Sequence, residues 1–321
     1  MFKKPTQQDV LRISLGHNGP VTVHNMQSDD EPGGLLRGTV VLDCPNELRI
    51  KALTLKFEGR AKVMWSEDGQ YFRDERQVIH HEWHFLSSLP YNKAHRLNGK
   101  HCYHFSLPLP ADLPSSLSED RATISYHLKA VAERPAFSTN FVYKRTINVQ
   151  REVLTPTLMR PVSSARTASS FSYRVQLNRH VYSPGAIVPL DVQVHTVCKV
   201  QSFVCVLKNY VTLVTARHAC RFSHTLAYLR DDHFGPRQGD NASQHDIILK
   251  TEQLKIPEHL VADTQTELLR VKHKLKISFM LIRQDGTPAP CFGSDRGQNH
   301  HTYQCDTSLR TRNSTNGSAH L

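Results

Sequence analysis

Hydrophobic and polar residues alternate along much of this chain. Between Ala122 and Ala132, Ile, Tyr, Leu and Ala occupy every second position, and most of the residues between them are polar. Successive side chains of a β-strand point to opposite faces of a sheet, so this alternation predicts strands with one buried face. The same pattern recurs at 10–15, 53–57, 171–177, 188–194 and 271–281. Clusters of turn-forming residues separate these segments, and the chain is therefore predicted to be all-β.

A proline-spaced loop interrupts this pattern in the first half of the chain. Tyr103–Leu107 alternates like a strand and is followed by Pro108, Pro110 and Pro114. Proline has no backbone N–H to donate to a sheet, so we expect the first strand to stop at Pro108 and the next to begin at Ala122. A second irregularity, at 51–52, shifts the alternation by one residue and predicts a β-bulge there.

The two strands and the loop between them resemble the arrestin superfamily, in particular the fungal α-arrestin-like proteins. Residues 105–117 read Phe-x-Leu-Pro-x-Pro-x-x-Leu-Pro-x-Ser-Leu, and residues 124–130 read Ile-x-Tyr-x-Leu-x-Ala. The run Leu-x-Leu-x-Phe-x-Gly at 53–59 is similar to an early strand of the same N-terminal domain. Tyr-Ser-Pro-Gly at 182–185 and Val-Lys-His-Lys-Leu-Lys-Ile at 271–277 are similar to parts of the C-terminal domain. The resemblance implies two antiparallel immunoglobulin-like β-sandwich domains, the arrestin fold.

This resemblance and the local composition divide the chain into four parts. We expect an arrestin-like N-terminal domain at 1–151, a linker at 152–170 and an arrestin-like C-terminal domain at 171–286. Residues 287–321 are polar and show little alternation. Arrestin-like proteins complete their second sandwich with further strands at this point, so the second domain is predicted to be incomplete. We expect the last segment to be a disordered or non-native tail that arose by truncation or altered splicing.

The composition is that of a globular protein. The 321 residues are 39% hydrophobic and 21% charged, which is within the ordinary range for folded domains. No segment has the roughly 18 consecutive apolar residues of a transmembrane helix, and the first residues lack the apolar region of a secretory signal. The seven cysteines include no Cys-x-x-Cys pair, so neither a disulfide framework nor a zinc motif is indicated. These features predict a cytoplasmic protein.

The formal net charge of +11 favours anionic partners, a class that includes acidic or phosphorylated protein segments, anionic membrane surfaces and nucleic acids. The most regular arrangement of basic residues is on one predicted strand, in which every second position is basic: Arg270, Lys272, Lys274 and Lys276. This face is a candidate contact for phosphate groups or lipid headgroups. The alternative is a solvated face whose lysines oppose unwanted pairing of sheet edges.

Two further groups of residues are candidates for chemistry. Ser163 and Ser169 in the linker each follow an arginine by three residues, a pattern for phosphorylation by basophilic kinases; a plain flexible connector is the alternative. His80, Glu82 and His84 share one face of a predicted strand and could converge on a metal ion. No distant Cys/His cluster completes such a site, so we interpret them as polar residues of an edge strand and expect no cofactor.

Motifs of the common enzyme classes are missing from the sequence: it has no Gly-x-Ser-x-Gly, no phosphate-binding Gly-rich loop and no His-Glu-x-x-His. The chain is therefore not expected to be an enzyme. The resemblance implies a cytoplasmic adaptor that is recruited to the plasma membrane or endosomes. Such an adaptor binds the tails of membrane transporters or receptors and links them to a HECT-type ubiquitin ligase and endocytosis. The Pro-Pro-x-Tyr or Leu-Pro-x-Tyr segments by which α-arrestins recruit these ligases are missing from this sequence.

Two alternative functions stay open on the sequence. One is an endosomal sorting scaffold of the same fold, similar to the arrestin-like retromer subunit. The other is a basic nucleic-acid-binding β protein, although no motif of interleaved aromatic and basic residues supports base stacking. We therefore do not expect nucleic acid to be the main partner.

Overall fold

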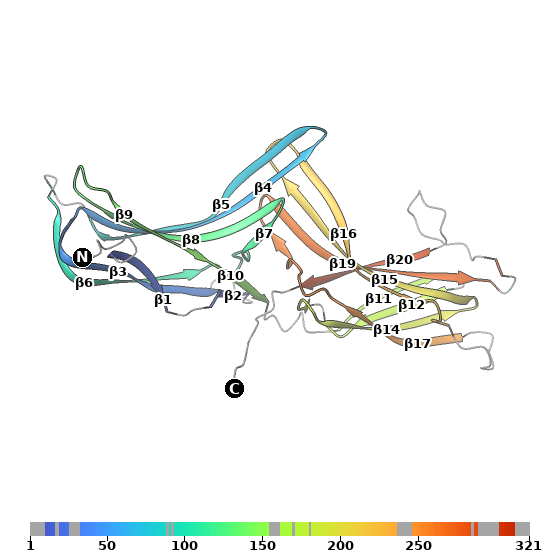
Figure 1. Ribbon diagram of the computed structural model, residues 1–321. Helices are drawn as coiled ribbons and strands as arrows, with labels where there is room; N and C mark the ends of the chain where they lie inside the picture. The colour runs from blue at the N-terminus through green and yellow to red at the C-terminus, as the bar shows by residue number, and fades with distance from the viewer. Residues whose placement is uncertain are drawn as a thin grey trace, which may run out of the picture. The chain divides into compact units, whose positions relative to one another are not determined.

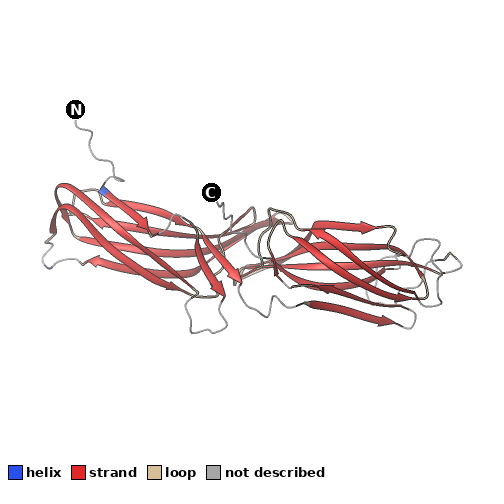
Figure 2. Cartoon of the chain, turned by 90° about the horizontal axis from the view of Figure 1, so that it is seen from below, coloured by secondary structure: helices blue, strands red, loops and turns tan. Residues whose placement is uncertain are grey.

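A computed structural model describes most of the chain. The described residues are 10–16, 19–25, 33–87, 90, 93–153, 161–168, 171–179, 181–235, 246–283, 286–287 and 302–311. Nearly all of them lie in strands or in the turns between strands (Figure 1), and Figure 2 shows the same strands coloured by secondary structure. The predicted all-β fold is therefore confirmed. The chain forms two compact units, of which the first comprises Met1–Val153, Leu213–Ala219 and Thr266–Leu269.

The N-terminal unit is built from two sheets and a short parallel pair. The first sheet has the order β1-β3-β6, with β1 at Leu11–Leu15, β3 at Gly34–Ile50 and β6 at His95–Leu109. The second has the order β5-β4-β8-β7, and β9 also pairs with β8. Its strands are β4 (Ala52–Glu67), β5 (Gln70–Leu86), β7 (Leu117–Glu119), β8 (Ala122–Glu133) and β9 (Phe141–Ile147). The parallel pair consists of β2 (Val21–Asn25) and β10 (Val149–Val153).

Alternation produces the core of this unit as the sequence predicts. Leu55 and Phe57 of β4 and Tyr126 and Leu128 of β8 are fully buried, while the residues between them face outward or are half-buried. The rings of Phe57 and Tyr126 stack with their centroids 6.1 Å apart. The buried face of β8 thus packs beside that of β4, and their intervening residues share the opposite, outer face of the sheet.

Two local predictions for this unit need correction. β6 does not stop at Pro108 but continues to Leu109, with Pro108 opposite Leu35 of β3. Among the described strands only β3 pairs with β6, and such an edge strand tolerates a proline. The irregularity expected at 51–52 is a break between β3 and β4; the register of β4 against β5 shifts just beyond it, between Leu53 and Thr54.

The C-terminal unit also contains two main sheets. One has the order β11-β12-β14-β17, and its strands are β11 (Val162–Ala168), β12 (Phe171–Leu177), β14 (Ile187–Thr196) and β17 (Asp246–Lys255). The other has the order β13-β20-β19-β15-β16, and β18 also pairs with β19. Its strands are β13 (Val181–Tyr182), β15 (Lys199–Val214), β16 (Ala219–Asp231), β18 (Thr264–Gln265), β19 (Leu269–Ile282) and β20 (Thr302–Thr311).

An aromatic cluster fills the core of the C-terminal unit. Phe279 of β19 is fully buried, and its ring centroid lies 5.1–5.9 Å from the rings of Phe171, Tyr173, Phe203 and Phe234. These residues come from β12, β15 and the turn after β16, as well as from β19. One side chain therefore joins both sheets of the unit.

Two segments expected to lack regular structure contain strands. The predicted linker at 152–170 includes β11, which pairs antiparallel with β12 along its whole length. The predicted disordered or non-native tail at 287–321 includes β20, which pairs with β19 from Met280 to His273. Polar sequence with little alternation concealed β20, because a strand can be held by backbone hydrogen bonds to a well-patterned neighbour.

Candidate functional site

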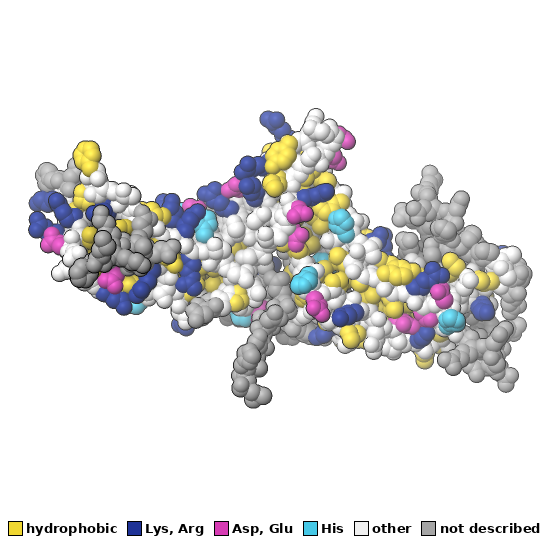
Figure 3. Space-filling model, viewed as in Figure 1, with side chains coloured by type: hydrophobic (Ala, Val, Ile, Leu, Met, Phe, Trp, Pro, Cys, Tyr) yellow, Lys and Arg dark blue, Asp and Glu magenta, His cyan; other side chains and the backbone are white. Residues whose placement is uncertain are grey.

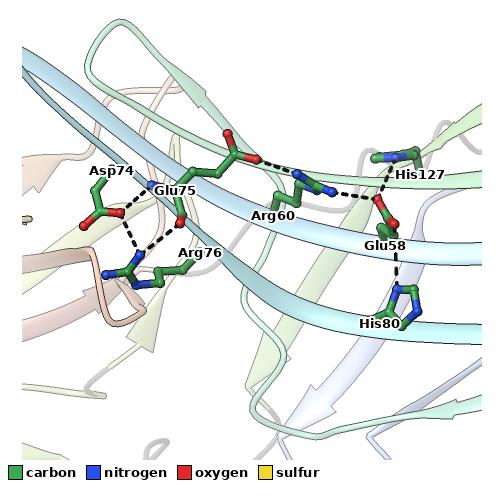
Figure 4. Close-up of polar contacts among 7 residues, drawn as sticks. All are labelled: Glu58, Arg60, Asp74, Glu75, Arg76, His80 and His127. Carbon is green, nitrogen blue, oxygen red and sulfur yellow. Dashed lines mark hydrogen bonds and ion pairs between the residues drawn. The ribbon is translucent and has the colours of Figure 1, made fainter.

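The outer face of the sheet β5-β4-β8-β9 carries a cluster of charged side chains. Period-two alternation directs Glu58 and Arg60 of β4 outward, and pairing with the neighbouring strands places His80 of β5 and His127 of β8 directly opposite Glu58. Figure 4 shows these four side chains together with Glu75 of β5. They come from three strands, of which β4 and β5 form a hairpin and β8 is distant in sequence, so the cluster depends on strand register.

Glu58 is the centre of this cluster. Its carboxylate accepts a hydrogen bond from Arg60 at 3.2 Å, and Arg60 donates a second hydrogen bond to Glu75 at 2.9 Å (Figure 4). Nδ1 of His80 lies 3.7 Å from one carboxylate oxygen of Glu58, and Nε2 of His127 lies 3.5 Å from the other. The carboxylates of Glu58 and Glu75 are thus both engaged by groups of the same face.

Two members of the cluster have pKa values that are lowered from their usual values. The hydrogen bond from Arg60 holds the pKa of Glu75 below its usual value, with smaller help from the charges of Arg60, Lys62 and Arg73. The pKa of His127 is lowered, chiefly by burial and then by the charge of Lys144, against the opposing pull of Glu58. The lowered pKa favours the neutral imidazole of His127 at neutral pH, in spite of its contact with Glu58.

The structure does not gather His80, Glu82 and His84 around a common point. Glu82 forms an ion pair with Lys56 of β4 at 3.0 Å, whereas His80 faces Glu58. Only the contact between Nε2 of His84 and Glu82, at 3.7 Å, joins two of the three. Throughout the described part of the chain, no group of three or more His, Cys, Asp or Glu side chains is arranged to hold a metal ion.

A row of lysines crosses the same outer face. Lys56, Lys129 and Lys144 lie directly opposite one another on β4, β8 and β9. Lys56 is paired with Glu82, but among the described residues no ion pair involves Lys129 or Lys144. Like charges directly opposite on neighbouring strands are unfavourable. The row therefore leaves a net positive region at the β8–β9 side of the sheet.

The second basic surface is the one predicted from the sequence. Arg270, Lys272, Lys274 and Lys276 lie on one face of β19, between buried residues; the first two are exposed and the last two half-buried. Nζ of Lys274 lies 5.4 Å from the centre of the Tyr210 ring, a cation–π contact with β15. Lys208, two residues before Tyr210 on β15, shares this face. We call these six residues the β19 face.

The position of β19 bears on how its lysines are interpreted. β19 is flanked by β15 on one side and by β20 on the other, so it is an internal strand of its sheet. Lysines that oppose edge pairing are useful on a strand whose edge is free. That explanation therefore does not account for the β19 face, although a solvated surface is still compatible with it.

Comparison with known proteins identifies the family. A model of the arrestin (or S-antigen) N-terminal domain matches residues 21–156, and a model of the arrestin (or S-antigen) C-terminal domain matches residues 167–292. The chain belongs to the arrestin family. Both matches follow the order of the two units, and β20 of this arrestin lies beyond the second match.

Curated relatives of this arrestin are found in fission yeast and in a nematode. Two arrestin domain-containing proteins of Schizosaccharomyces pombe are 28% and 25% identical over 88% and 86% of the chain, which corresponds to 50% and 48% of their own length. A third S. pombe protein, named as a candidate arrestin-related trafficking adapter, is 22% identical over 78% of the chain and 47% of its own length. The chain thus spans about half the length of the curated relatives it matches.

The remaining sequence candidates of this arrestin are placed as follows. Ser163 is an exposed residue of β11. Its backbone is paired with β12, so a kinase would meet a strand at this position and not a flexible connector. Ser169 lies outside the described residues. Within the described ranges, no helix is long and apolar enough to span a membrane.

The Glu58 cluster and the Lys129–Lys144 pair were not anticipated from the sequence. His80 and Glu82 were recognised as polar positions, but their partners on β4 and β8 follow only from the register of three strands. The four cations of β19 needed no such information, because they occupy alternate positions of a single strand, whereas Lys208 and Tyr210 join them only through the pairing of β15 with β19.

Proposed function

We propose that this arrestin is a trafficking adaptor that binds the cytoplasmic tails of membrane transporters or receptors and links them to ubiquitin-dependent endocytosis. The observation that carries this proposal is that both arrestin domain models match, in order, along one chain whose relatives include proteins named as candidate arrestin-related trafficking adapters. The adaptor works in the cytoplasm and is recruited to the plasma membrane or to endosomes. It acts by binding and has no enzymatic activity.

The β19 face is the proposed tail-binding site. Alternate residues of a strand are about 7 Å apart, and an extended peptide spaces its alternate side chains by the same distance. Acidic or phosphorylated residues at every second position of a tail can therefore each meet one cation of Arg270, Lys272, Lys274 and Lys276. Arg270 and Lys272 are the exposed pair and make the first contacts. Arginine adds bidentate hydrogen bonds to carboxylate or phosphate.

Recruitment of a ubiquitin ligase is proposed for the whole protein and is not assigned to a site of this chain. The sequence contains no Pro-Pro-x-Tyr segment, and the chain covers about half of the length of its curated relatives. A HECT-type ligase is therefore reached either through another surface of this chain or through sequence that this chain does not include. Mass spectrometry of neighbouring proteins shows whether a HECT-type ligase is near this protein, whichever of the two routes it uses.

The site is tested by direct binding to tail peptides. We expect the double variant Arg270→Glu/Lys272→Glu to bind acidic or phosphorylated tail peptides at least about tenfold more weakly than the parent chain, because two charge-assisted contacts become repulsive. The matched control is Arg96→Glu/Lys100→Glu, which makes the same charge change at exposed positions of β6. Equal losses in both variants would mean that net charge, and not the β19 face, attracts the peptide.

The adaptor function is tested separately by proximity labelling in cells. With the labelling enzyme fused to the N-terminal unit, we expect plasma-membrane transporters or receptors and a HECT-type ligase among the labelled neighbours. Labelling dominated by retromer components would favour an endosomal sorting scaffold of the same fold. Labelling dominated by nucleic-acid-bound proteins would overturn the adaptor proposal.

A further inference from the structure

The loop between β8 and β9 exposes a large apolar side chain in an unusual conformation. Phe137 has a relative exposure of 110% and a φ of +68°. The N–H of Ser138 donates to the carbonyl of Pro135 at 3.1 Å, so Phe137 is the third residue of a tight turn. Turns with positive φ at this position normally use Gly or Asn, since this backbone conformation is unfavourable for a bulky residue. The fold thus holds Phe137 in solvent by means of a strained turn.

The outer face of the β8–β9 hairpin continues from this loop in a regular order. Val131 and Val142 form the first outward-facing cross-strand pair, and Val142 is 40% exposed. Lys129 and Lys144 form the next outward-facing pair. Two residues of a strand span about 7 Å. The hairpin therefore presents Phe137 at its end, a valine pair behind it, and a lysine pair about 7 Å further back.

The charge at this end of the hairpin is positive. Glu133 is an exposed carboxylate at the end of β8, and the guanidinium of Arg134 lies 5.0 Å from the ring centre of Phe141. Together with Lys129 and Lys144 further back on the strands, this end of the hairpin carries one negative and three positive groups. Figure 3 shows a hydrophobic group standing out where Figure 1 places the β8–β9 loop, with Lys and Arg side chains on the surface nearby.

We propose that the end of the β8–β9 hairpin is a membrane-docking tip: Phe137 enters the interfacial layer of an anionic bilayer, and Lys129 and Lys144 contact lipid phosphates behind it. Aromatic side chains favour the membrane–water interface, and each lysine near an anionic surface adds attraction. An acidic protein segment would use the two lysines, but it would gain little from a single aromatic side chain at the end of the loop. A bilayer uses both features.

The docking tip is a different surface from the β19 face, which is proposed to bind tails, and the two surfaces can be tested independently. The probe is sedimentation with phosphatidylcholine vesicles, prepared with or without phosphatidylserine. We expect the parent chain to bind only the vesicles that contain phosphatidylserine. Tail-peptide binding, measured in the absence of vesicles, should be unchanged by substitutions at the tip.

Phe137→Gly is the decisive variant, because glycine accepts positive φ and the turn is relieved rather than broken. We expect this variant to be at least as heat-stable as the parent and to bind phosphatidylserine vesicles at least about tenfold more weakly, given the apolar area that Phe137 loses. The matched control is Leu249→Ala, which removes an apolar side chain that is 73% exposed on β17. It should bind vesicles like the parent.

Lys144→Gln tests the electrostatic part of the tip. We expect it to weaken vesicle binding about fivefold, the effect of one lysine near an anionic surface, whereas Lys100→Gln on β6 should change it little. A Phe137→Trp variant should show a blue shift of its emission on adding vesicles, beyond that of Trp65 and Trp83 in the parent. Unchanged vesicle binding by Phe137→Gly would overturn the proposal. A loss in Lys144→Gln alone would mean that the lysines contact the anionic surface without entry of Phe137, and this would also overturn the docking tip.

Discussion

His127 lies among charges of both signs on the outer face of β8. Glu58 is 3.5 Å from its Nε2, and Lys144, Arg60 and Lys129 are the nearby cations that oppose its protonation. Burial of the ring and these cations outweigh the single carboxylate, so the folded state lowers the pKa of His127 below its ordinary value of 6.5. A histidine beside a glutamate is commonly expected to be protonated and to form an ion pair, but here the neutral form of His127 is favoured.

This lowered pKa predicts a pH dependence of stability. Below about pH 6.5 the unfolded chain binds a proton at His127 that the folded chain resists, so the free energy of unfolding should fall as the pH decreases through and below this value. His127→Gln should reduce this slope. Urea unfolding measured across that pH range checks it, with His84→Gln, at a histidine whose side chain is 62% exposed, as the control. A slope that is the same in His127→Gln and in the parent chain would contradict the assignment.

The proline-spaced loop between β6 and β7 is held by side-chain hydrogen bonds to β8 and β10. The hydroxyl of Tyr126 on β8 donates to the carbonyl of Pro114 at 2.6 Å, and this phenol is buried. The hydroxyls of Ser115 and Ser116 accept from the N–H groups of Arg151 and Val149 of β10. A segment that cannot form a ladder because of its prolines is therefore held by side-chain hydrogen bonds instead.

Tyr126→Phe should consequently destabilise the N-terminal unit. The variant keeps the ring stacked on Phe57 but leaves the buried carbonyl of Pro114 without its donor, which costs about 1–3 kcal/mol of the free energy of unfolding. Chemical denaturation followed by tryptophan emission measures this loss. Tyr71→Phe is a suitable control, since Tyr71 is 65% exposed and donates only to the sulfur of Met64. Equal stability of the two variants would show that the tether contributes nothing.

Sequence reasoning was most successful where a strand carries its own pattern. The alternation in β8, β12, β14 and β19 predicts their buried faces directly, and the four cations of β19 follow from one of these strands. It was least successful where a partner strand decides the outcome. Pro108 belongs to β6 because that strand is at a sheet edge, and β20 forms against β19 despite its polar sequence. Such elements depend on tertiary pairing more than on local propensity.

At the scale of the whole molecule, the sequence does not predict which charged side chains the pairing of several strands brings together on the outer face of a sheet. Lys129 and Lys144 are 15 residues apart in sequence and become neighbours only through the register of β8 and β9. A shift of one residue in that register would turn one of them to the other face of the sheet. The resemblance supplies the fold and the order of the domains, but it does not supply which charges of this chain meet across its sheets.

The two units have separate cores and separate spectroscopic signals. Both tryptophans, Trp65 and Trp83, belong to the N-terminal unit, whereas Phe279 lies at the centre of the aromatic cluster of the C-terminal unit. Far-UV circular dichroism reports the strands of both units, and tryptophan emission reports one. A substitution in one core can therefore be followed independently of the other.

Phe279→Ala should remove the ring that joins both sheets of the C-terminal unit and should cost that unit about 3–5 kcal/mol. We expect the circular dichroism signal to lose part of its amplitude at lower temperature, while the tryptophan transition shifts much less, because the cavity opens in a core that contains no tryptophan. Met280→Ala, at the next and 37% exposed position of β19, is the control and should leave both transitions nearly unchanged. If both signals of Phe279→Ala shifted equally, the two units would unfold as one cooperative structure, and the destabilisation measured at either core would belong to the whole chain.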